Sequence, residues 1–507
     1  MVRLLTTVAC LTTLGLANAQ WLDPTFGTGG LVATSLNAGY DGAFSTLVQP
    51  DGKIVVAGSI AGNGGYDFLV ARYLADGQLD PAFGTGGFST HHERAQDFGR
   101  DVALQADGGL VVVGTSSGGG TDKVVMRFTA DGDLDPSFGN AGVVIIDDSA
   151  VDDALWAVAV QPDQRIVIVG QGFNGTLRTF YIARLNTNGS FDPTFGNSGE
   201  YEHLIGNDFC WAQDVALMDD GRIVVVGTTH TTGISAHDAA VVRYMPDGSF
   251  DPSFGDGGKV VIPWSVESDV ANALAVYPDG RVLVGGSSSL TDTHIAASRL
   301  LADGTLDPDF GANGTVLTYA GVSPTRCGGI ALDAEDRILL AGTAAQDGTQ
   351  RSSYLCRLTS DGVLDPSFGN SGELINGTPG VYEETPAMAL QADGKIVLAG
   401  ITGAGTAIDV RLIRYTDAAI TSVRPLDGSF DMLHADDGEL ELRSLNTGMV
   451  DYRIITSSGQ LLQHGSVFTT SGARERITFE DRPSPGLHFI TITSAYGSWT
   501  AKFMVQH

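Results

Sequence analysis

Short apolar runs separated by polar turns recur along most of the chain. Residues 43–60 read AFSTLVQPDGKIVVAGSI, in which two apolar runs flank a Pro-Asp-Gly-Lys turn. Asp and Gly tolerate the positive φ angles that tight hairpin turns require, so this segment predicts a β-hairpin. The second run, 54–58, is apolar at consecutive positions, which is typical of a strand covered on both faces.

The same arrangement is repeated along the chain. Turns related to the first recur at 105–109, 161–165, 218–222, 277–281, 333–337 and 391–395. A D-P-x-F-G motif accompanies these turns at intervals of 55–59 residues, and it begins at Asp23, Asp80, Asp135, Asp192, Asp251, Asp307 and Asp365. A period this steady indicates stacked or radially arranged supersecondary units.

The runs on both sides of each hairpin give four strands per unit. Repeated antiparallel units with both faces covered predict blades packed around an axis. The alternative is a linear solenoid, which would need atypical capping units at its ends. The last unit lacks its own D-P-x-F-G motif, whereas Trp21–Gly27 supplies a spare copy. We therefore predict an all-β fold, namely a seven-bladed β-propeller over residues 20–416, closed by its N-terminal segment, followed by a small β-sandwich.

An Arg that recurs in the fourth strand of each unit supports a closed ring. The motif Asp follows this Arg by eight residues in the first six units, but Arg414 has Ser422 there, which leaves Asp23 as its partner. An Arg fork can hold a carboxylate and nearby carbonyl groups together. We predict structural rather than catalytic pairs, with the motif Phe filling the gap between blades. The pairs are Arg72–Asp80, Arg127–Asp135, Arg184–Asp192, Arg243–Asp251, Arg299–Asp307, Arg357–Asp365 and Arg414–Asp23.

These elements resemble the delta-60 repeat family, whose unit has a similar length and carries the same D-G-K, V-V-A-G, A-R and L-D-P-x-F-G elements. The resemblance covers about residues 21–416. It implies a β-propeller of unassigned biochemical function, of a kind often found in large secreted or surface proteins of bacteria.

The N-terminus has the pattern of a secretory signal. An apolar run follows Arg3, and Ala17-Asn18-Ala19 forms an A-x-A cleavage site. We interpret residues 1–19 as a signal peptide, because the run is too short for a comfortable membrane span. The exported protein is then expected to have no membrane-spanning segment.

The C-terminal region, 417–507, alternates apolar and polar residues between turns, which predicts a small β-sandwich. It resembles the C-terminal sorting domain of the type IX secretion system of Bacteroidota, through segments 452–455, 459–461, 486–490 and 502–505. One departure is Arg-Pro-Leu-Asp-Gly where that family opens with Asn-Pro, and another is His488 at the usual Tyr position. The resemblance implies export through that machinery, removal of the tail, and release or attachment at the outer cell surface.

Charge and cysteine content limit the partners. A net charge of −30 repels phosphate backbones and anionic lipid, so we expect no binding to nucleic acids or membrane surfaces. We also expect the protein to be a monomer. After Cys10 leaves with the signal, Cys210, Cys327 and Cys356 permit one disulfide at most. No cofactor is predicted, although a divalent cation such as Ca²⁺ remains open.

Acidic residues recur just before the inner hairpin of most units. Alignment on the turn places Cys210 and Thr325 at this position in units four and six. The other five units have Asp41, Asp97, Asp153, Asp269 and Glu383. Such a rim could bind Ca²⁺ through carboxylate oxygens, or each carboxylate could cap its own loop by accepting backbone N–H bonds.

Departures from the repeat are further candidates for a site. The inserted segment 90–101 contains His91, His92 and Glu93, which could ligate a metal or belong to an exposed loop. Trp156 and Trp211 are expected near the acidic rim, where they could stack on a sugar or pack between blades.

No G-x-S-x-G, H-E-x-x-H, P-loop or EF-hand pattern is present. We therefore expect a secreted or cell-surface binding or scaffold module with a glycan or protein ligand. The alternative is an extracellular polysaccharide hydrolase or lyase with its site on the propeller rim, because catalytic carboxylates could come from different blades. Two carboxylates at one place, with one perturbed pKa, would favour the enzyme.

Overall fold

The computed structural model describes residues 21–416, except 63, 119, 147–152, 207, 231–235, 290–292, 319–322, 347–349, 379 and 406, together with strands between 430 and 505. The predicted signal peptide over 1–19 lies outside the described residues. The chain divides into two compact units, Met1–Asp417 and Ala418–His507. Among the described residues, no helix has the length and apolarity needed to cross a membrane.

The first unit consists of four-stranded antiparallel groups, numbered here as blades 1 to 7. The first three are β2 (Asp41–Val48), β3 (Ile54–Gly62), β4 (Gly65–Tyr73) and β5 (Phe88–His91); β6 (Gln96–Leu104), β7 (Leu110–Ser117), β8 (Thr121–Phe128) and β9 (Val143–Ile146); and β10 (Ala154–Val160), β11 (Ile166–Phe173), β12 (Arg178–Leu185) and β13 (Glu200–His203).

Blades 4 to 6 follow the same order. They are β14 (Cys210–Leu217), β15 (Ile223–His230), β16 (His237–Tyr244) and β17 (Lys259–Ile262); β18 (Asp269–Val276), β19 (Val282–Ser289), β20 (Thr293–Leu300) and β21 (Thr315–Thr318); and β22 (Ser323–Leu332), β23 (Ile338–Gln346), β24 (Gln350–Leu358) and β25 (Glu373–Asn376). Blade 7 contains β26 (Tyr382–Leu390), β27 (Ile396–Ala404), β28 (Ala407–Tyr415) and β1 (Leu31–Thr34).

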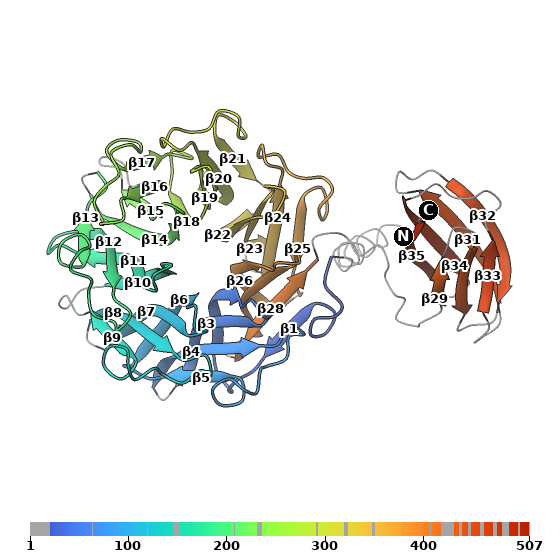
Figure 1. Cartoon of the computed structure of the whole chain (residues 1–507), viewed down its shortest axis with the longest axis horizontal. Coiled ribbons are helices and arrows are strands. Elements are labelled where there is room, and N and C mark those ends of the chain that lie inside the picture. Colours follow the sequence, from blue (N-terminus) through green and yellow to red (C-terminus); the bar gives the residue numbers. More distant parts are fainter. Residues whose placement is uncertain are drawn as a thin grey trace, which may run out of the picture. The chain divides into compact units, whose positions relative to one another are not determined.

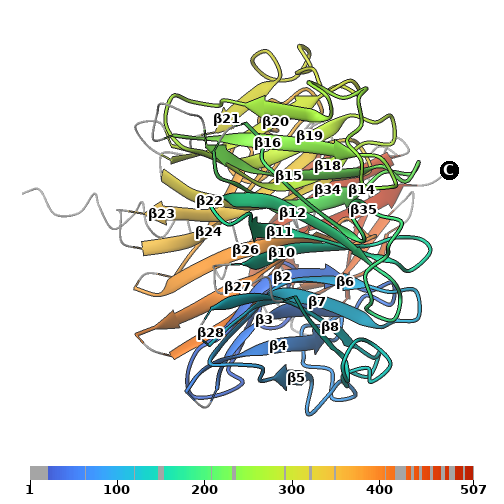
Figure 2. The ribbon, with the colours of Figure 1, turned by 90° about the vertical axis from the view of Figure 1, so that its left-hand side faces the viewer.

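The blades are arranged around a ring, with β6, β10, β14, β18, β22 and β26 nearest its centre (Figure 1). Seen from the side, the labelled strands of blades 1, 3 and 5 lie at successive heights from the bottom to the top of the view (Figure 2). Blades 1 and 2 form one continuous sheet because Tyr66 pairs with Gln96 in parallel. The prediction of an all-β propeller is confirmed.

The N-terminal segment completes the last blade. β1 pairs antiparallel with β28, from Leu31 opposite Ile413 to Thr34 opposite Val410. The backbone N–H of Thr416 also donates to the carbonyl oxygen of Trp21 at 2.8 Å. The two ends of the repeat region therefore lie side by side in one sheet.

Each recurring Arg contacts the motif Asp of its own unit. In every pair that the sequence predicts, from Arg72–Asp80 to Arg414–Asp23, the Arg Nε lies 2.7–2.9 Å from Asp Oδ2. Arg72 Nη1 also donates to Ala130 O in blade 2 at 2.6 Å, and its guanidinium covers the buried Phe83 ring at 4.6 Å. The pair therefore links consecutive blades as well as stabilising a turn.

The boundaries of each blade differ from those of the sequence unit in one respect. The Arg lies on the third strand of its blade, not the fourth, because the short strand that follows each motif belongs to the preceding blade. β5, for example, follows the motif at Asp80 and pairs with β4. The outer strand of each blade is thus supplied after the motif turn.

Apolar side chains fill the space between neighbouring blades. In one such cluster, Val111 and Val113 of β7 lie with Ile166 and Ile168 of β11. Because residues of a second strand face the blade on either side in alternation, every position is covered, which explains the continuous apolar runs. A similar cluster contains Val56 of blade 1 and Val397 of blade 7, so the core continues through the closure.

The second unit contains two antiparallel sheets. Their strands are β29 (Phe430–Ala435), β30 (Glu439–Ser444), β31 (Gly448–Thr456), β32 (Leu461–Thr469), β33 (Arg474–Thr478), β34 (Gly486–Ser494) and β35 (Gly497–Val505), in the orders β29-β30-β33 and β32-β31-β34-β35. The side-chain packing that would make these sheets a sandwich lies outside the described residues.

Candidate functional site

The innermost strand of each blade contains a β-bulge. In blade 3, for example, the register between β10 and β11 shifts between Leu155 and Ala157, so Trp156 has no direct partner. A bulge places an extra residue on one strand and re-aims its side chain. The innermost strand of blade 6 has two such shifts and the other innermost strands have one each, and the residues within them include Phe44, Arg100, Trp156, Gln213, Asn272, Gly328 and Pro386.

The recurring Gly of the second strand makes room for this bulge. A Cβ on Gly170 would lie 1.9 Å from the carbonyl oxygen of Ala154, and one on Gly58 would lie 1.8 Å from that of Gly42. Any other residue would force the two strands apart at this point. The Gly of the repeated Val-Val-Ala-Gly element therefore permits the irregularity that directs a side chain into the centre of the ring.

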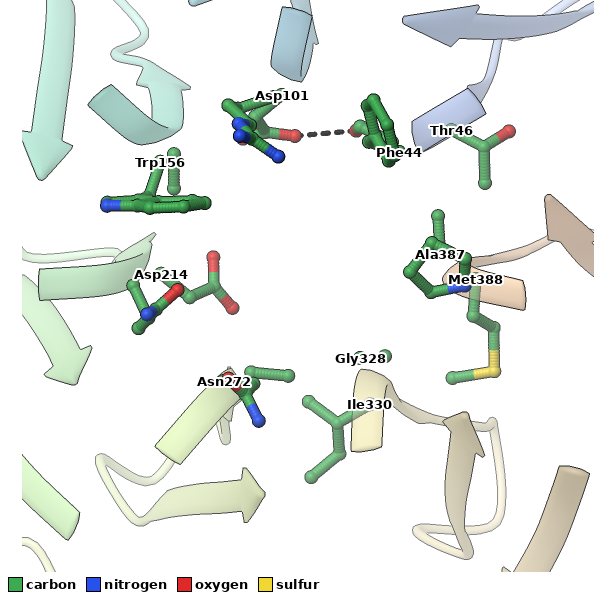
Figure 3. Close-up of a pocket in the computed structure, with 17 residues that line it drawn as sticks. Phe44, Thr46, Asp101, Trp156, Asp214, Asn272, Gly328, Ile330, Ala387 and Met388 are labelled. Atoms are coloured by element: carbon green, nitrogen blue, oxygen red, sulfur yellow. Dashed lines mark hydrogen bonds between the residues drawn. The ribbon is translucent and has the colours of Figure 1, made fainter. Parts of the chain in front are cut away.

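The bulge residues line one cavity in the central channel. Its volume is about 230 Å³, and all seven innermost strands contribute to its wall. Asp101 and Asp214 lie above and below Trp156 on one side, opposite Ala387 and Met388 (Figure 3). One wall is therefore rich in polar and aromatic groups, whereas the opposite wall is mostly apolar.

A cation and aromatic rings lie together on the polar wall. The Arg100 guanidinium carbon lies 4.7 Å from the centroid of Trp156 and 5.4 Å from that of Phe44. Attraction between a guanidinium group and aromatic faces holds such a cluster in place without fully shielding its charge. The indole nitrogen of Trp156 points away from the channel centre, so the edge of the six-membered ring points toward the cavity (Figure 3).

Asp101 connects three neighbouring blades. Its Oδ1 accepts a hydrogen bond from Ser45 Oγ of blade 1 at 2.6 Å, and its Oδ2 accepts one from the backbone N–H of Val158 in blade 3 at 2.9 Å. Burial among protein atoms raises the pKa of Asp101 to about 6, although these hydrogen bonds oppose the shift. The carboxyl group therefore titrates near neutral pH.

Asp214 has an equivalent position in blade 4. Its Oδ1 accepts from the backbone N–H of Val215 and its Oδ2 from that of Leu274 in blade 5, both at 2.8 Å. Burial and the charge of Asp101 raise the pKa of Asp214 to about 7. The two carboxyl groups therefore influence each other's ionisation within one cavity.

The chemistry of the cavity is mixed rather than strongly charged. Arg100 offers donors, Asp101 and Asp214 offer acceptors, and the amides of Gln213 and Asn272 offer both. A small set of polar groups beside an aromatic face is typical of sites for small polar ligands. Such a wall can bind an uncharged or weakly charged molecule that carries several hydroxyl groups.

The predicted acidic rim residues have a different role. Asp41, Asp97, Asp153, Asp269 and Glu383 are all buried, with relative exposures of 0–2%. Asp41 Oδ2 accepts from the N–H groups of Leu36 and Asn37 at 2.6 and 2.9 Å. Asp269 accepts from Ser265 in the same way. Asp97 and Glu383 accept backbone N–H bonds from their preceding loops as well, whereas Asp153 pairs with Lys123. Within the described chain no three of the five share a metal-ligand cluster.

Other candidate residues lie outside the channel. Trp211 belongs to a ring cluster on blade 4, where it stacks with Phe209 at an interplanar angle of 9°. His91 Nε2 lies 3.2 Å from Glu93 Oε2, whereas His92 turns to Asp67 instead. Cys210, Cys327 and Cys356 are buried thiols, and no disulfide joins them within the described residues.

Most channel residues were not singled out from the sequence, although a signal for them exists. The bulge residue always follows the rim position by three residues, as Phe44 follows Asp41. The next position is Ser, Ala or Gly in five units, and Asp only at Asp101 and Asp214. Alignment of the units column by column would therefore have identified both carboxylates as departures from the repeat.

Comparison with protein families identifies the repeats. Residues 49–83, 105–138, 161–195, 219–254, 278–310, 336–368 and 391–416 match the family model described as "Domain of unknown function (DUF5122) beta-propeller". The chain carries DUF5122 β-propeller repeats. The first DUF5122 segment begins at the hairpin turn of blade 1 and ends in the D-P-x-F-G motif, so the family pattern contains the Gly and Arg described above. No curated protein matches the chain significantly.

Solved structures with folds like the DUF5122 propeller have low sequence identity. Polysaccharide lyase Uly1 is 11% identical with a TM-score of 0.45, covering 80% of this chain and 95% of that chain. Puromycin hydrolase is 14% identical with a TM-score of 0.43, covering 89% and 61%. The β-propeller domain of the Trilobed protease from Pyrococcus furiosus is 11% identical with a TM-score of 0.39, covering 75% and 96%. None of these likenesses carries an argument about activity.

Proposed function

We propose that this chain is a binding module whose channel cavity holds a hydroxyl-rich ligand, with a glycan unit as the chemical class. The observation that carries the proposal is the wall formed by Trp156, Arg100 and the two amides of Gln213 and Asn272. An aromatic ring packs against the C–H face of a sugar, while nearby amide and guanidinium groups bond its hydroxyls. The cavity of about 230 Å³ has room for one or two sugar units rather than a buried oligosaccharide.

A glycan array probed with the purified full chain tests this proposal, in the presence and absence of Ca²⁺. We expect selective binding that Trp156→Ala abolishes and that does not need Ca²⁺. Trp211→Ala is the matched control, because that ring lies on blade 4 outside the cavity. If the wild-type chain binds no glycan, or if Trp211→Ala removes binding and Trp156→Ala does not, the channel proposal is wrong.

The proposed setting is outside the cell or on its outer surface. It is supported by the signal pattern over 1–19 and the tail that resembles a type IX sorting domain, which forms a compact unit of its own. In a Bacteroidota host with that secretion system, deletion of residues 418–507 should leave the propeller in the periplasm, because it would no longer cross the outer membrane. Equal export of the shortened and intact chains would contradict this assignment.

A second candidate function is glycoside or polyuronide cleavage. It is favoured by Asp101 and Asp214, which face one cavity and have pKa values raised to about 6 and about 7. Two carboxyl groups in one cavity, with pKa values raised toward neutral pH, suit proton transfer by an acid or a base. Against it, both oxygens of each group already accept hydrogen bonds, and all of these except the bond from Val215 to Asp214 join blades.

Asp214→Asn separates binding from catalysis. The amide keeps the size of the side chain but cannot donate or accept a proton as an acid or base. A binding module should retain glycan affinity in this variant and release no sugar in either form. Release of oligosaccharide by the wild-type chain, lost in Asp214→Asn while binding persists, would replace the binding proposal with the enzyme.

A further inference from the structure

A separate group of metal-ligating side chains lies at the joint between blades 1 and 2. Asp67 on β4, His92 before β6 and Asp97 on β6 each place one ligand atom within 4.8 Å of the others. His92 Nδ1 lies 2.6 Å from Asp67 Oδ1 and 3.9 Å from Asp97 Oδ2. The Asp97 side chain is fully buried whereas 55% of the His92 side chain is exposed, so the group opens to solvent on one side.

Two glycines allow the strands and the inserted segment to approach here. A Cβ on Gly62 would lie 2.4 Å from an oxygen of the Asp67 carboxylate, and one on Gly65 would lie 1.5 Å from the carbonyl oxygen of Ala95. The N–H of Tyr66 then donates to that carbonyl at 3.3 Å. The hairpin between β3 and β4 and the segment that carries His92 therefore pack directly against each other.

Asp97 is held in one orientation by its surroundings. Its Oδ1 accepts a hydrogen bond from Ser116 Oγ at 2.6 Å, and its Oδ2 accepts one from the backbone N–H of Glu93 at 2.8 Å. Carboxylates that bind metals are usually oriented by hydrogen bonds of this kind. A cation at this point would thus meet a carboxylate that is already in place.

The next joint provides an internal comparison. Asp122 precedes Arg127 by five residues, as Asp67 precedes Arg72, and Asp153 occupies the rim position of Asp97. There, Arg94 Nη1 lies 2.6 Å from Asp122 Oδ2, and Lys123 Nζ lies 3.0 Å from Asp153 Oδ2. Each carboxylate at that joint therefore has a basic side chain beside it, whereas Asp67 and Asp97 meet at a histidine, which is itself a metal ligand.

We propose that Asp67, His92 and Asp97 form a site for a divalent transition metal ion, with Zn²⁺ as the reference metal. One imidazole nitrogen and two carboxylate oxygens match the ligands that zinc takes in proteins. Because the metal–ligand distances are about 2.0–2.1 Å, His92 Nδ1 and Asp67 Oδ1 would move apart from 2.6 Å by about 0.7 Å for an ion to bridge them. Water would complete the coordination on the exposed side. The site is independent of the channel cavity, so it neither requires nor tests the glycan proposal.

Calorimetric titration of the tag-free full chain with ZnCl₂, after removal of metals with EDTA, tests the site. We expect Zn²⁺ binding in which His92→Ala removes one site or weakens it by at least about tenfold, because loss of even a group that supports a ligand costs about 10–100-fold. Asp67→Asn should weaken the same site. His91→Ala is the matched control, because His91 contacts Glu93 and lies outside the group.

Several results would overturn the proposal. They are no Zn²⁺ uptake by the wild-type chain, unchanged uptake in His92→Ala, or an equal loss in His91→Ala. Ca²⁺ binding that depends on Asp67 but not on His92 would instead assign a site for a hard cation. X-ray absorption on the zinc-loaded wild-type chain decides the matter if a variant fails to fold, since absence of a histidine ligand contradicts the site.

Discussion

Arg414 Nε donates to Asp23 Oδ2 at 2.9 Å, although 391 residues separate the two in sequence. The same guanidinium donates to the carbonyl oxygen of Ala75 in blade 1 at 2.5 Å. Across the two ends of the propeller, this pair makes the same contact as the remaining Arg–Asp pairs make within the continuous chain. It therefore converts a row of blades into a ring.

Loss of this Arg should weaken the closure of the ring first. Arg414→Met leaves only Lys395 Nζ, 3.5 Å from Asp23 Oδ2, to compensate the buried carboxylate, so we expect the free energy of unfolding to fall by about 3 kcal/mol. The N-terminal strand should also become cleavable by protease before the rest of the propeller unfolds. Urea denaturation and limited proteolysis measure the two effects.

Arg243→Met is the control for that experiment. Arg243 makes the same contact with Asp251 at 2.7 Å within the continuous part of the chain. We expect a similar loss of stability without early cleavage of the N-terminal strand. Equal proteolysis patterns in the two variants would show that Arg414 has no special part in closure.

A second prediction concerns the glycine opposite a channel bulge. In Gly170→Ala the added Cβ would overlap the carbonyl oxygen of Ala154, so strand separation should cost about 1–3 kcal/mol and displace Trp156. Gly118→Ala is the control. A Cβ there would lie 3.3 Å from the nearest atom, in the side chain of Arg94, rather than 1.9 Å from a backbone carbonyl oxygen, so it should be accommodated with much less strain. Comparable unfolding free energies in the two variants would contradict the role given to the bulge.

A third prediction concerns the pH dependence of stability. The folded-state pKa of Asp214 is raised to about 7 from an ordinary value of 3.8, mainly by burial. The folded chain therefore holds this proton more tightly than the unfolded chain, which gives stability below about pH 4 that is lost as the pH rises through 7. Wild type should lose more stability than Asp214→Asn between pH 5 and 8, measured by urea denaturation.

Asp247→Asn provides the matched control for the titration. A hydrogen bond from Ser249 lowers the pKa of Asp247, so this group is ionised in both states between pH 5 and 8. The variant should follow the wild-type slope over that interval. If Asp214→Asn also runs parallel to wild type, its carboxyl group does not titrate near neutral pH.

The sequence predicts the repeat architecture well because that architecture rests on local, repeated signals. The turn at Pro50–Lys53 and the Arg72–Asp80 spacing are visible in one unit and repeated in the others. The channel site depends on a different kind of information. Phe44 and Arg100 have unlike side chains, and the bulge, which is a three-dimensional feature, places them in one ring.

Two other features depended on distant residues. The sequence does not link Asp67 to His92, because 25 residues separate them and it is the packing of the inserted segment against β4 that brings them together. The acidic rim was open between loop capping and Ca²⁺ binding, since the sequence does not show whether carboxylates point inward or toward their own loops. The buried Asp41 carboxylate accepts hydrogen bonds from two backbone N–H groups of its own loop, so this residue caps the loop.

Closure of the ring is the central claim, because it places seven bulges around one channel. Thr34 and Val410 are directly opposite in the closing pair of strands, at a spacing that suits a disulfide. Mild oxidation of Thr34→Cys/Val410→Cys, followed by mass spectrometry, should find a disulfide that links these two positions within one chain. Absence of that link, or a link formed only between two chains, would contradict the closed ring.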